Sequence, residues 1–506
     1  MRTLTVGETI TFEDISILIS SQVAVSIDSA SQKRIAESND FVKTAPKSKV
    51  IYGINTGFGP MATTYIGPNK QQQLQYNLIR SHACGLGSPI DARTVRTMMF
   101  IRLHTLAKGY SGVSQSVLET LISFIEHDIT PVVPEHGSVG ASGDLVQLAH
   151  IALSLIGEGN VFYENKVQPT SEVLSKLSIT PATLTGRDGL ALINGTTAMT
   201  AIAAVNVLQL EKLLSHATRA AALLYEIAEV NTESIHSIVS EVRPHPGQTE
   251  IAKTLRTLLA QSIRVAAANT RTVPDAVVET STLQSAPQEI YSLRCVPQIL
   301  GPVVETVDFS KAKIQTEMNA VTDNPVIKDG HAYHNGNFHG DYLSLEMDKC
   351  RIATTKLSIL LERQLNFIVN PRQNGILPPF ANRGVIGLDL SLQAAQFVAT
   401  STTAENQTLS NSMYVHSITT NNDNQDVVSM GTNSALLTAK VVENTFHVQA
   451  ILHVAIMQAI DVLKISKEIA PELKKAYASI RTVFPVLTED RYFATQLQDV
   501  VDQLKN

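Results

Sequence analysis

Three long segments with apolar residues at helical spacing constrain the fold of this chain more than any other feature. They cover residues 198–229, 344–369 and 435–463. Within each segment, apolar side chains recur every three or four residues, as they do along one side of an α-helix. Helices this long that are apolar on more than one face are normally buried between other helices. The sequence therefore predicts a mainly α-helical protein with a long central helical bundle.

The sequence contains few strand signals, and they are short. We expect short strands at residues 49–54 and 160–167. The chain has 506 residues, which exceeds the size of one typical hydrophobic core, so more than one domain is expected. We predict an N-terminal domain over residues 1–195, which holds the glycine-rich loops. A central and C-terminal helical bundle is predicted over residues 196–506.

Composition argues against several classes of function. A formal net charge of -6 does not suit a nucleic-acid-binding surface. Three cysteines, far apart in the sequence, form no disulfide framework and no Cys-x-x-Cys metal site. Residues 1–14 hold no apolar core of a secretory signal, and Lys440, Glu443 and His447 interrupt the apolar segment 435–463. We expect a cytoplasmic protein without nucleic-acid or membrane partners.

The tripeptide Ala141-Ser142-Gly143 lies in a loop with glycine at positions 137, 140 and 143. Glycine permits tight turns, and Ala and Ser add little bulk. If the amide nitrogen of Gly143 attacks the carbonyl of Ala141 and two waters leave, a methylidene-imidazolone ring with an electron-poor alkene results. Standard catalytic side chains are nucleophiles, acids or bases, so this ring would supply an electrophile that they cannot. Asp144 is placed to assist the proton transfers.

A phosphate-binding loop and a purely structural turn are the alternatives for this segment. The loop precedes an apolar helical segment, and helix N-termini bind phosphate. Its glycine spacing matches neither G-x-G-x-x-G nor G-x-x-x-x-G-K-[ST], so no nucleotide site is predicted. A structural turn is the default interpretation of three glycines alone, and only further sequence blocks favour the ring.

Residues 137–159, GSVGASGDLVQLAHIALSLIGEG, resemble the signature of the aromatic amino acid ammonia-lyases and aminomutases. Four further blocks match this family in the same order: YGINTGFG at 52–59, NGT at 194–196, YSLRCVPQ at 291–298 and NFHG at 337–340. A glutamate and an NQD run within residues 405–431 also match. The resemblance spans almost the whole chain and is nearest to the bacterial tyrosine and histidine lyases. It implies the fumarase/aspartase-like superfamily architecture.

The resemblance also implies a prosthetic group and a set of site residues. The prosthetic group is 4-methylidene-imidazole-5-one (MIO), formed autocatalytically from Ala141, Ser142 and Gly143, with no metal or nucleotide. Tyr52 is the candidate base and Tyr291 a second catalytic residue. Arg294 is the candidate clamp for the substrate carboxylate, because a guanidinium fork matches a carboxylate with two hydrogen bonds. The other substrate-binding residues implied are Gly59, Asn194, Gln288, Phe338 and Gln425.

Each of these residues also has an ordinary structural interpretation. A tyrosine beside a glycine is more often packed than catalytic, an arginine on a helix is ordinarily solvated, and a lone phenylalanine belongs to a core. If residues 291–294 are helical, Tyr291 and Arg294 share one face. His331, His334 and His339 lie close together in sequence, but no Cys or carboxylate arrangement completes a metal site with them. We assign that cluster to a loop and predict no metal.

Substrate choice depends on His82, which stands where the family carries the residue that selects the substrate ring. A histidine there suits a ring with a polar edge, such as the tyrosine hydroxyl or the histidine imidazole. Phenylalanine would leave this buried polar group unpaired. The phenylalanine-specific members place an apolar residue at this position, and this chain departs from them. Glu405 favours an imidazole, whereas the run 422–426 resembles tyrosine lyases.

The resemblance predicts non-oxidative deamination of L-tyrosine to trans-4-coumarate and ammonia. Deamination of L-histidine to urocanate is the alternative, and a tyrosine 2,3-aminomutase would share every motif named above. A catalytically silent family member would be expected to lose Ser142, Tyr52 or Arg294, and all three are present. The family pattern further implies a homotetramer whose active sites draw residues from several chains.

Overall fold

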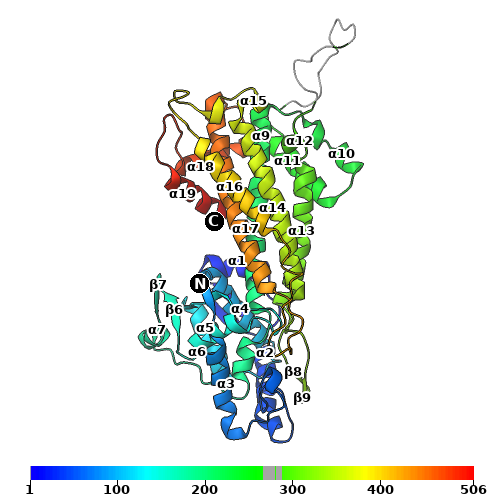
Figure 1. Cartoon of the computed structure of the whole chain (residues 1–506), viewed down its shortest axis with the longest axis vertical. Helices are drawn as coiled ribbons and strands as arrows, with labels where there is room; N and C mark the ends of the chain where they lie inside the picture. Colours follow the sequence, from blue (N-terminus) through cyan, green and yellow to red (C-terminus); the bar gives the residue numbers. More distant parts are fainter. Residues whose placement is uncertain (1, 266–279, 281–287) are drawn as a thin grey trace. The chain divides into compact units, whose positions relative to one another are not determined.

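The computed structural model describes residues 2–265, 280 and 288–506 (Figure 1). By contact these residues form two compact units. Unit 1 comprises residues 1–208, 310–348 and 412–439, and unit 2 comprises residues 209–309, 349–411 and 440–506. Four long helices have residues in both units: α9 (Thr197–Ala228), α13 (Val296–Met318), α14 (Asp341–Val369) and α17 (Gly431–Leu463). The predicted division of the chain at residue 195 stays a prediction.

Unit 1 contains eight complete α-helices among its described residues. They are α1 (Phe12–Ser20), α2 (Ser29–Thr44), α3 (Pro68–His82), α4 (Ala92–Ala107), α5 (Gln115–Glu126), α6 (Leu145–Leu155), α7 (Thr170–Leu177) and α8 (Asp188–Ile193). Two short 3-10 helices, η1 (Ala45–Lys47) and η2 (Gly59–Met61), lie between α2 and α3. Every residue of α4 from Thr94 to Ala107 is buried. This helix is therefore the centre of the unit, as expected for a helix that is packed on all its faces.

The strands of unit 1 are short and form four small sheets. β1 (Arg2–Val6) pairs in parallel with β2 (Val23–Ile27), with Leu4 opposite Val25. β3 (Leu86–Pro89) is antiparallel to β5 (Pro134–His136), and β8 (Val326–Lys328) is antiparallel to β9 (His331–Tyr333). The third sheet has the order β4 (Thr130–Pro131), β6 (Asn160–Tyr163), β7 (Lys166–Pro169). The strand signal at residues 160–167 is confirmed as the β6–β7 hairpin.

The predicted strand over residues 49–54 is wrong, because this segment forms a turn. The amide of Asn55 donates hydrogen bonds to the carbonyl oxygens of Pro46 and Lys49, at 3.2 and 2.7 Å. Its side-chain oxygen accepts the N–H of Ile51 at 2.8 Å. An asparagine that satisfies neighbouring backbone groups in this way competes with strand pairing. The result is a compact loop in which Tyr52 lies.

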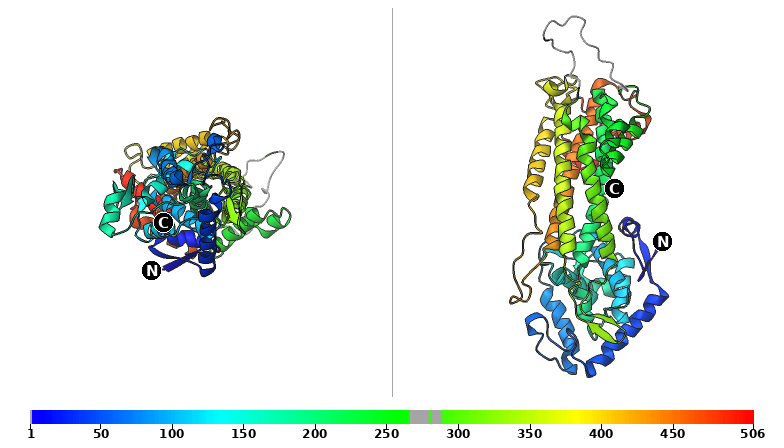
Figure 2. Two further views of the ribbon diagram at one scale, coloured as in Figure 1. Left: turned by 90° about the horizontal axis from the view of Figure 1, so that it is seen from below. Right: turned by 90° about the vertical axis from the view of Figure 1, so that its right-hand side faces the viewer.

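The described residues of unit 2 form helices joined by loops, with no β-strand among them. Its complete helices are α10 (Ser237–Glu241), α11 (Pro246–Leu259), α12 (Tyr291–Arg294), α15 (Pro371–Asn374), α16 (Gln393–Leu409), α18 (Pro471–Val483) and α19 (Ala494–Lys505), with the 3-10 helices η3 (Thr232–Ile235) and η4 (Pro379–Ala381). Within this unit the long helices α9, α13, α14 and α17 run side by side with α16 (Figures 1 and 2). Helices α9, α14 and α17 correspond to the three predicted segments, so the mainly helical fold is confirmed.

Helix α17 is long and apolar enough to span a membrane by length and composition. Its most apolar 18-residue window has a mean hydropathy of 1.5, and 78% of that window is buried inside the structure. Leu452, Ala455 and Ile456 in this helix are completely buried. The apolar surface of α17 is thus used in packing between helices.

Candidate active site

The Ala141-Ser142-Gly143 tripeptide lies in a tight loop that ends where α6 begins. Gly140 and Gly143 have φ values of +69° and +68°, a backbone region that glycine adopts without a steric cost. The backbone of Gly143 lies directly against that of Gly195, where a side chain at position 143 would collide with the Gly195 carbonyl. The N–H of Asp144 donates to that carbonyl at 2.9 Å. Close contact between two backbone segments therefore holds the tripeptide in its turn.

Ser142 has both of its oxygens held by side-chain amides. Nδ2 of Asn194 donates to the Ser142 carbonyl oxygen at 3.1 Å. Nε2 of Gln425 donates to the Ser142 hydroxyl oxygen at 2.8 Å. The N–H of Gly143 donates no hydrogen bond to any described residue, so its nitrogen is not engaged elsewhere. A small, left-handed Gly143 with an uncommitted amide, next to a nearly buried Ala141, fits the requirements for closing the MIO ring.

Asp144 is fully buried, and its carboxylate holds the tripeptide loop through hydrogen bonds. Its carboxylate accepts hydrogen bonds from the Ser138 hydroxyl at 2.8 Å, from the backbone N–H of Met199 at 2.9 Å and from the Thr432 hydroxyl. Burial raises the pKa of Asp144, and the hydrogen bonds from Thr432, Met199 and Ser138 act in the opposite direction. Asp144 thus ties the loop to the first residues of α9 and α17. Its predicted role in proton transfer stays a prediction.

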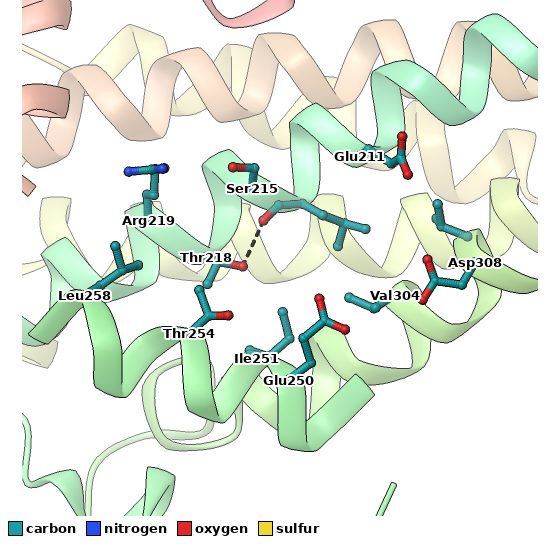
Figure 3. Close-up of a pocket in the computed structure, with 12 residues that line it drawn as sticks. Glu211, Ser215, Thr218, Arg219, Glu250, Ile251, Thr254, Leu258, Val304 and Asp308 are labelled. Atoms are coloured by element: carbon teal, nitrogen blue, oxygen red, sulfur yellow. Dashed lines mark hydrogen bonds between the residues drawn. The ribbon is translucent and has the colours of Figure 1, made fainter. Parts of the chain in front are cut away.

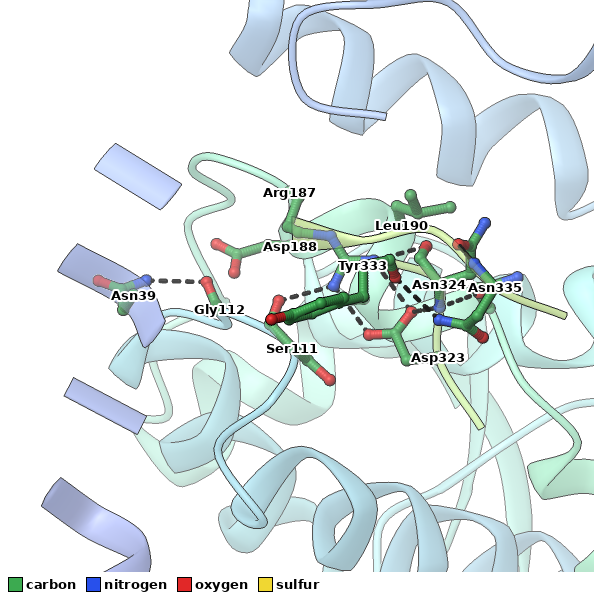
Figure 4. A network of polar contacts seen from close by, with 12 residues as sticks. Asn39, Ser111, Gly112, Arg187, Asp188, Leu190, Asp323, Asn324, Tyr333 and Asn335 are labelled. Carbon is green, nitrogen blue, oxygen red and sulfur yellow. Dashed lines mark hydrogen bonds and ion pairs between the residues drawn. The ribbon is translucent and has the colours of Figure 1, made fainter. Parts of the chain in front are cut away.

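Asn194 follows the last residue of α8. A polar network that includes Arg187, Asp323 and Asn324 fixes its position, and Figure 4 shows these three residues. The side-chain oxygen of Asn194 accepts the N–H of Asn324 at 2.9 Å. Asp323, the preceding residue, pairs with Arg187 through two hydrogen bonds of 2.8 and 2.9 Å. Arg187 also donates to the carbonyl oxygen of Asn324 at 2.9 Å. The ion pair therefore positions the backbone that in turn positions Asn194 against Ser142.

Tyr52 lies in the turn formed by residues 51–55, where Gly53 has a φ of +74°. Its phenolic oxygen accepts the N–H of Gly59 at 3.0 Å. Its own backbone N–H donates to Nε2 of His334 at 3.3 Å, and the rings of Phe58 and His334 meet the Tyr52 ring edge-on. Gly59 therefore contacts the proposed base, and its predicted contact with substrate remains untested. His334 joins this site although sequence spacing gave it no role.

His82 is the last residue of α3, the helix that also supports the Tyr52 loop. Gln75, two helical turns earlier, donates to the carbonyl oxygen of Gly53 at 3.1 Å. Nδ1 of His82 bonds to the Leu78 carbonyl oxygen at 2.9 Å. Burial lowers the pKa of His82, and the bond to Leu78 acts in the opposite direction. A carbonyl oxygen can only accept, so Nδ1 carries the proton in this bond, and the neutral form of the ring then has Nε2 as its acceptor.

Phe338 lies in the segment between β9 and α14. Two residues later, the N–H of Gly340 donates to the carbonyl oxygen of Gly140 at 3.1 Å. His339 bonds through Nε2 to the carbonyl oxygen of Val427 at 3.2 Å. These bonds attach the segment to the tripeptide loop and to the loop that carries Gln425. Phe338 itself is half-buried.

The remaining predicted residues Tyr291, Gln288 and Arg294 belong to unit 2. Residues 291–294 form α12, and the guanidinium carbon of Arg294 lies 4.8 Å from the centre of the Tyr291 ring. The shared helical face of these two residues is thus confirmed. Arg294 and Gln288 line one cavity of about 360 Å³. Nε of Arg294 is buried and has no hydrogen-bond partner among the described residues.

Glu405 also belongs to unit 2, on the exposed side of α16. Its carboxylate accepts a hydrogen bond from the Asn444 amide at 2.7 Å. A second cavity of about 300 Å³ lies between α9, α11 and α13 (Figure 3). Thr218 on its wall bonds to a backbone carbonyl of its own helix. No predicted site residue lines this second cavity, so it is separate from the candidate chemistry.

Across residues 2–265, 280 and 288–506, no three His, Cys, Asp or Glu side chains are grouped as a metal site. Of the three clustered histidines, His334 contacts Tyr52 and His339 contacts Val427. His331 stacks edge-on against Tyr333 in β9. The cluster is therefore divided between a strand and a loop.

Sequence reasoning missed the residues that hold the tripeptide loop from a distance. Thr432 and Arg187 lie in none of the quoted motifs, and Ser138 lies in the segment 137–159 but was given no role there. Polar residues of these types occur throughout the chain. Their partners lie between 6 and 288 positions away in sequence. Such pairings carry no local signal that a single sequence could reveal.

Comparison with known proteins identifies the family. The profile described as "Aromatic amino acid lyase" matches residues 10–482. A histidine ammonia-lyase of Geobacillus sp. (strain WCH70) is 37% identical over 99% of this chain and 96% of its own length. A tyrosine ammonia-lyase of Cupriavidus metallidurans is also 37% identical, over 92% and 89%. The crystal structure of a tyrosine aminomutase from Streptomyces globisporus superposes with a TM-score of 0.94 at 34% identity, covering 99% of this chain and 97% of that one. The chain belongs to the aromatic amino acid lyase family, which has the fumarase/aspartase-like helical architecture.

Proposed function

We propose that this protein is an ammonia-lyase that converts L-tyrosine to trans-4-coumarate and ammonia. The observation that carries the choice of substrate is the state of His82. Its Nδ1 proton is bonded to the Leu78 carbonyl, and burial lowers the pKa of its ring. A neutral imidazole with a free Nε2 accepts a hydrogen bond from a phenol O–H. Phenylalanine has no such donor and would leave Nε2 unpaired.

The prosthetic group in this proposal is MIO, formed from Ala141, Ser142 and Gly143. When present, it supplies an electrophile that captures the substrate amine and so makes nitrogen a better leaving group. Asn194 would hold it, since its amide contacts the Ser142 carbonyl oxygen, which stays in the ring. Gln425 contacts the Ser142 hydroxyl oxygen, which ring formation removes. The fit of the tight Gly143 turn to ring closure supports this assignment.

The side chains of this chain supply the remaining functions. Arg294, with a buried Nε that has no partner among the described residues, binds the substrate carboxylate in two-hydrogen-bond geometry. Tyr52 removes the β-proton through its phenolic oxygen, and the N–H of Gly59 orients that oxygen. Tyr291 stacks on Arg294 and limits its rotation. Phe338 and Gln288 complete the substrate-binding surface.

L-histidine is the alternative substrate, because an imidazole N–H can also donate to His82. Glu405 was expected to favour that substrate. The carboxylate of Glu405 is bonded to Asn444 in unit 2, and this pairing weakens the case for a direct contact with an imidazole. A tyrosine 2,3-aminomutase shares the same residues and differs only in the fate of the ammonia. The presence of Ser142, Tyr52 and Arg294 argues against a silent member of the family.

We propose a homotetramer as the assembly. In unit 2, Val385, Ile386 and Leu388 before α16, and Phe397 on α16, expose between 63 and 76% of their surface. Several large apolar side chains exposed within residues 385–397 support a surface that another chain covers. A cytoplasmic location without membrane or nucleic-acid partners completes the proposal, in keeping with the negative net charge.

The proposal is tested by incubating the purified protein separately with tyrosine, histidine and phenylalanine. Each conjugated acid product absorbs in the ultraviolet, and β-amino acid products are separated by chromatography. We expect coumarate from tyrosine, with the highest kcat/KM of the three. If urocanate forms from histidine faster than coumarate forms from tyrosine, the substrate is L-histidine and not L-tyrosine. Accumulation of β-tyrosine would identify an aminomutase, and no reaction with any of the three would contradict the function.

A further inference from the structure

We propose that Gln425 assists formation of the ring by holding the Ser142 hydroxyl while that group leaves. This inference rests on the proposed function, in which residues 141–143 form MIO. It assigns Gln425 a role in the maturation of the protein, in addition to any contact with substrate.

The two oxygens of Ser142 have different fates in ring formation, and each is held by a different amide. The carbonyl oxygen stays in the ring, and Asn194 donates to it at 3.1 Å. The hydroxyl oxygen leaves as water, and Gln425 donates to it at 2.8 Å. Gln425 is thus the side chain that contacts the leaving atom. Asp144, the nearby carboxylate, already accepts three hydrogen bonds from its own surroundings.

The loop over residues 417–430 is built to present Gln425 at this point. An isolated antiparallel backbone bridge between Thr420 and Gln425 joins the two sides of its tip. The tip turns through three consecutive non-glycine residues with left-handed φ values of 57°, 50° and 59°, namely Asn421, Asn422 and Asp423. Non-glycine residues rarely adopt this region, and they do so where the surroundings hold them. The side-chain amide of Asn421 lies directly against Gly59.

The C-terminal end of this loop is attached to the tripeptide loop itself. The N–H of Met430 donates to the carbonyl oxygen of Val139 at 3.0 Å. The hydroxyl of Ser429 donates to the carbonyl oxygen of Gly140 at 2.8 Å. These bonds fix the distance between the loop that carries Gln425 and the residues that react. The contact between Gln425 and Ser142 is therefore set by several independent bonds.

Ring formation removes two waters without a change of oxidation state. The Gly143 nitrogen forms a bond to the Ala141 carbonyl carbon, and its proton passes to the Ala141 oxygen. That oxygen then leaves as the first water, together with the N–H proton of Ser142, as the C=N bond forms. The second water consists of the Ser142 hydroxyl and the Cα proton, and its loss creates the exocyclic C=C bond. An N–H donor aimed at the departing hydroxyl stabilises its developing negative charge. Gln425 donates this bond and keeps its own protons.

Three variants separate this role from general support of the loop. Gln425→Glu keeps the length and shape of the side chain but removes the N–H donor at neutral pH. Gln425→Ala removes the whole side chain. Asn424→Ala is the matched control, because it shortens a neighbouring amide that is exposed and makes no side-chain contact with Ser142. Circular dichroism and thermal unfolding check that each variant is folded.

The readout is the mass of a proteolytic peptide that contains residues 141–143, followed over time after purification. Wild type and Asn424→Ala should lack two waters. Gln425→Glu and Gln425→Ala should accumulate chains that retain the Ser142 hydroxyl and lack at most one water, with loss of the second water slowed on the order of tenfold. The ultraviolet absorbance of the conjugated ring should fall in parallel.

The outcomes separate this inference from the proposed function. A wild-type peptide with the full sequence mass would contradict the proposed function, and with it the need for maturation. If the Gln425 variants lose both waters at the wild-type rate, the inference about Gln425 is overturned, and the proposed function is not affected. An equal defect in Asn424→Ala would also overturn it, because the loop rather than the N–H donor would then be responsible.

Discussion

Arg187 and Asp323 form an ion pair whose two side chains have no exposed surface. Two hydrogen bonds join the guanidinium and the carboxylate, and a further bond from Arg187 reaches the carbonyl oxygen of Ser111 at 2.7 Å. Through the N–H of Asn324 this pair determines where Asn194 lies, and Asn194 holds Ser142. A buried charge pair thus supports the reacting tripeptide from outside the motif.

Asp323→Asn should destabilise the folded protein by about 3–5 kcal/mol, because it leaves a buried guanidinium without its counter-charge. The midpoint of thermal unfolding should fall accordingly. Glu37→Gln is the control, since it removes an exposed partner of Lys33 at 4.0 Å and should change stability by less than about 0.5 kcal/mol. Equal midpoints for the two variants would show that the buried pair contributes no special stability.

The mature protein should have a mass lower than its sequence mass by two waters, because MIO formation removes them. Ser142→Ala has no hydroxyl to lose and should lack the conjugated alkene. Its activity should fall by orders of magnitude, while its unfolding midpoint stays near that of wild type. Intact-protein mass spectrometry combined with a turnover assay checks both statements. Active wild-type protein with an unmodified tripeptide would refute the mechanism.

His82→Phe should shift selectivity from tyrosine toward phenylalanine. The substitution removes the free Nε2 acceptor and adds apolar surface. Loss of a buried polar partner should lower kcat/KM for tyrosine by the equivalent of about 1–3 kcal/mol. The kcat/KM for phenylalanine should rise. Steady-state kinetics with both substrates measure the ratio. If the ratio of the two kcat/KM values does not change, His82 does not contact the ring.

Stability should fall in acid partly through His104, which is completely buried. Its Nδ1 accepts the N–H of Gly7 at 3.2 Å and its Nε2 contacts the Asn319 side-chain oxygen at 3.2 Å, an arrangement that suits the neutral ring. Burial, together with the nearby charge of Lys108, lowers its pKa from 6.5 to about 3. Below pH 6.5 the unfolded chain therefore binds a proton that the folded chain does not. The contribution of His104 is fully present above pH 6.5.

As pH falls from 6.5 toward about 3, this contribution should be lost at about 1.4 kcal/mol per pH unit. His104→Gln, which keeps a donor and an acceptor but does not titrate, should show a shallower decline than wild type. Unfolding midpoints measured across this pH range give the difference. Parallel curves for the two proteins would mean that His104 is not neutral in the folded state.

The protein should sediment as a tetramer in analytical ultracentrifugation, because large apolar side chains such as Leu388 and Phe397 are exposed on the isolated chain. Charged substitutions at these two positions should weaken assembly and reduce specific activity together. As a control, a charge placed at the exposed Val167 of β7, outside residues 385–397, should change neither. A wild-type monomer with full specific activity would contradict the proposed assembly.

Local patterns determined a large part of this protein. Apolar spacing predicted helices α9, α14 and α17, because the side chains of an amphipathic or buried helix repeat along the chain itself. The tripeptide and its glycines predicted a tight turn, since glycine at positions 140 and 143 permits left-handed backbone. A short strand signal at residues 160–167 predicted extended structure there, and the structure forms the β6–β7 hairpin over this segment. The spacing of Tyr291 and Arg294 predicted their shared helical face.

Only the tertiary structure decided which groups meet around the tripeptide. Asn194 is 52 positions from Ser142 and Gln425 is 283 positions away, so nothing in the local sequence specifies that both bond to it. Residues 49–54 were wrongly predicted as a strand because the Asn55 side chain closes a turn there. The lowered pKa of His82 depends on its burial in the folded chain. The spacing of apolar residues shows which side of a single helix or strand is buried. Contacts between helices, strands and loops depend on the folding of the whole chain.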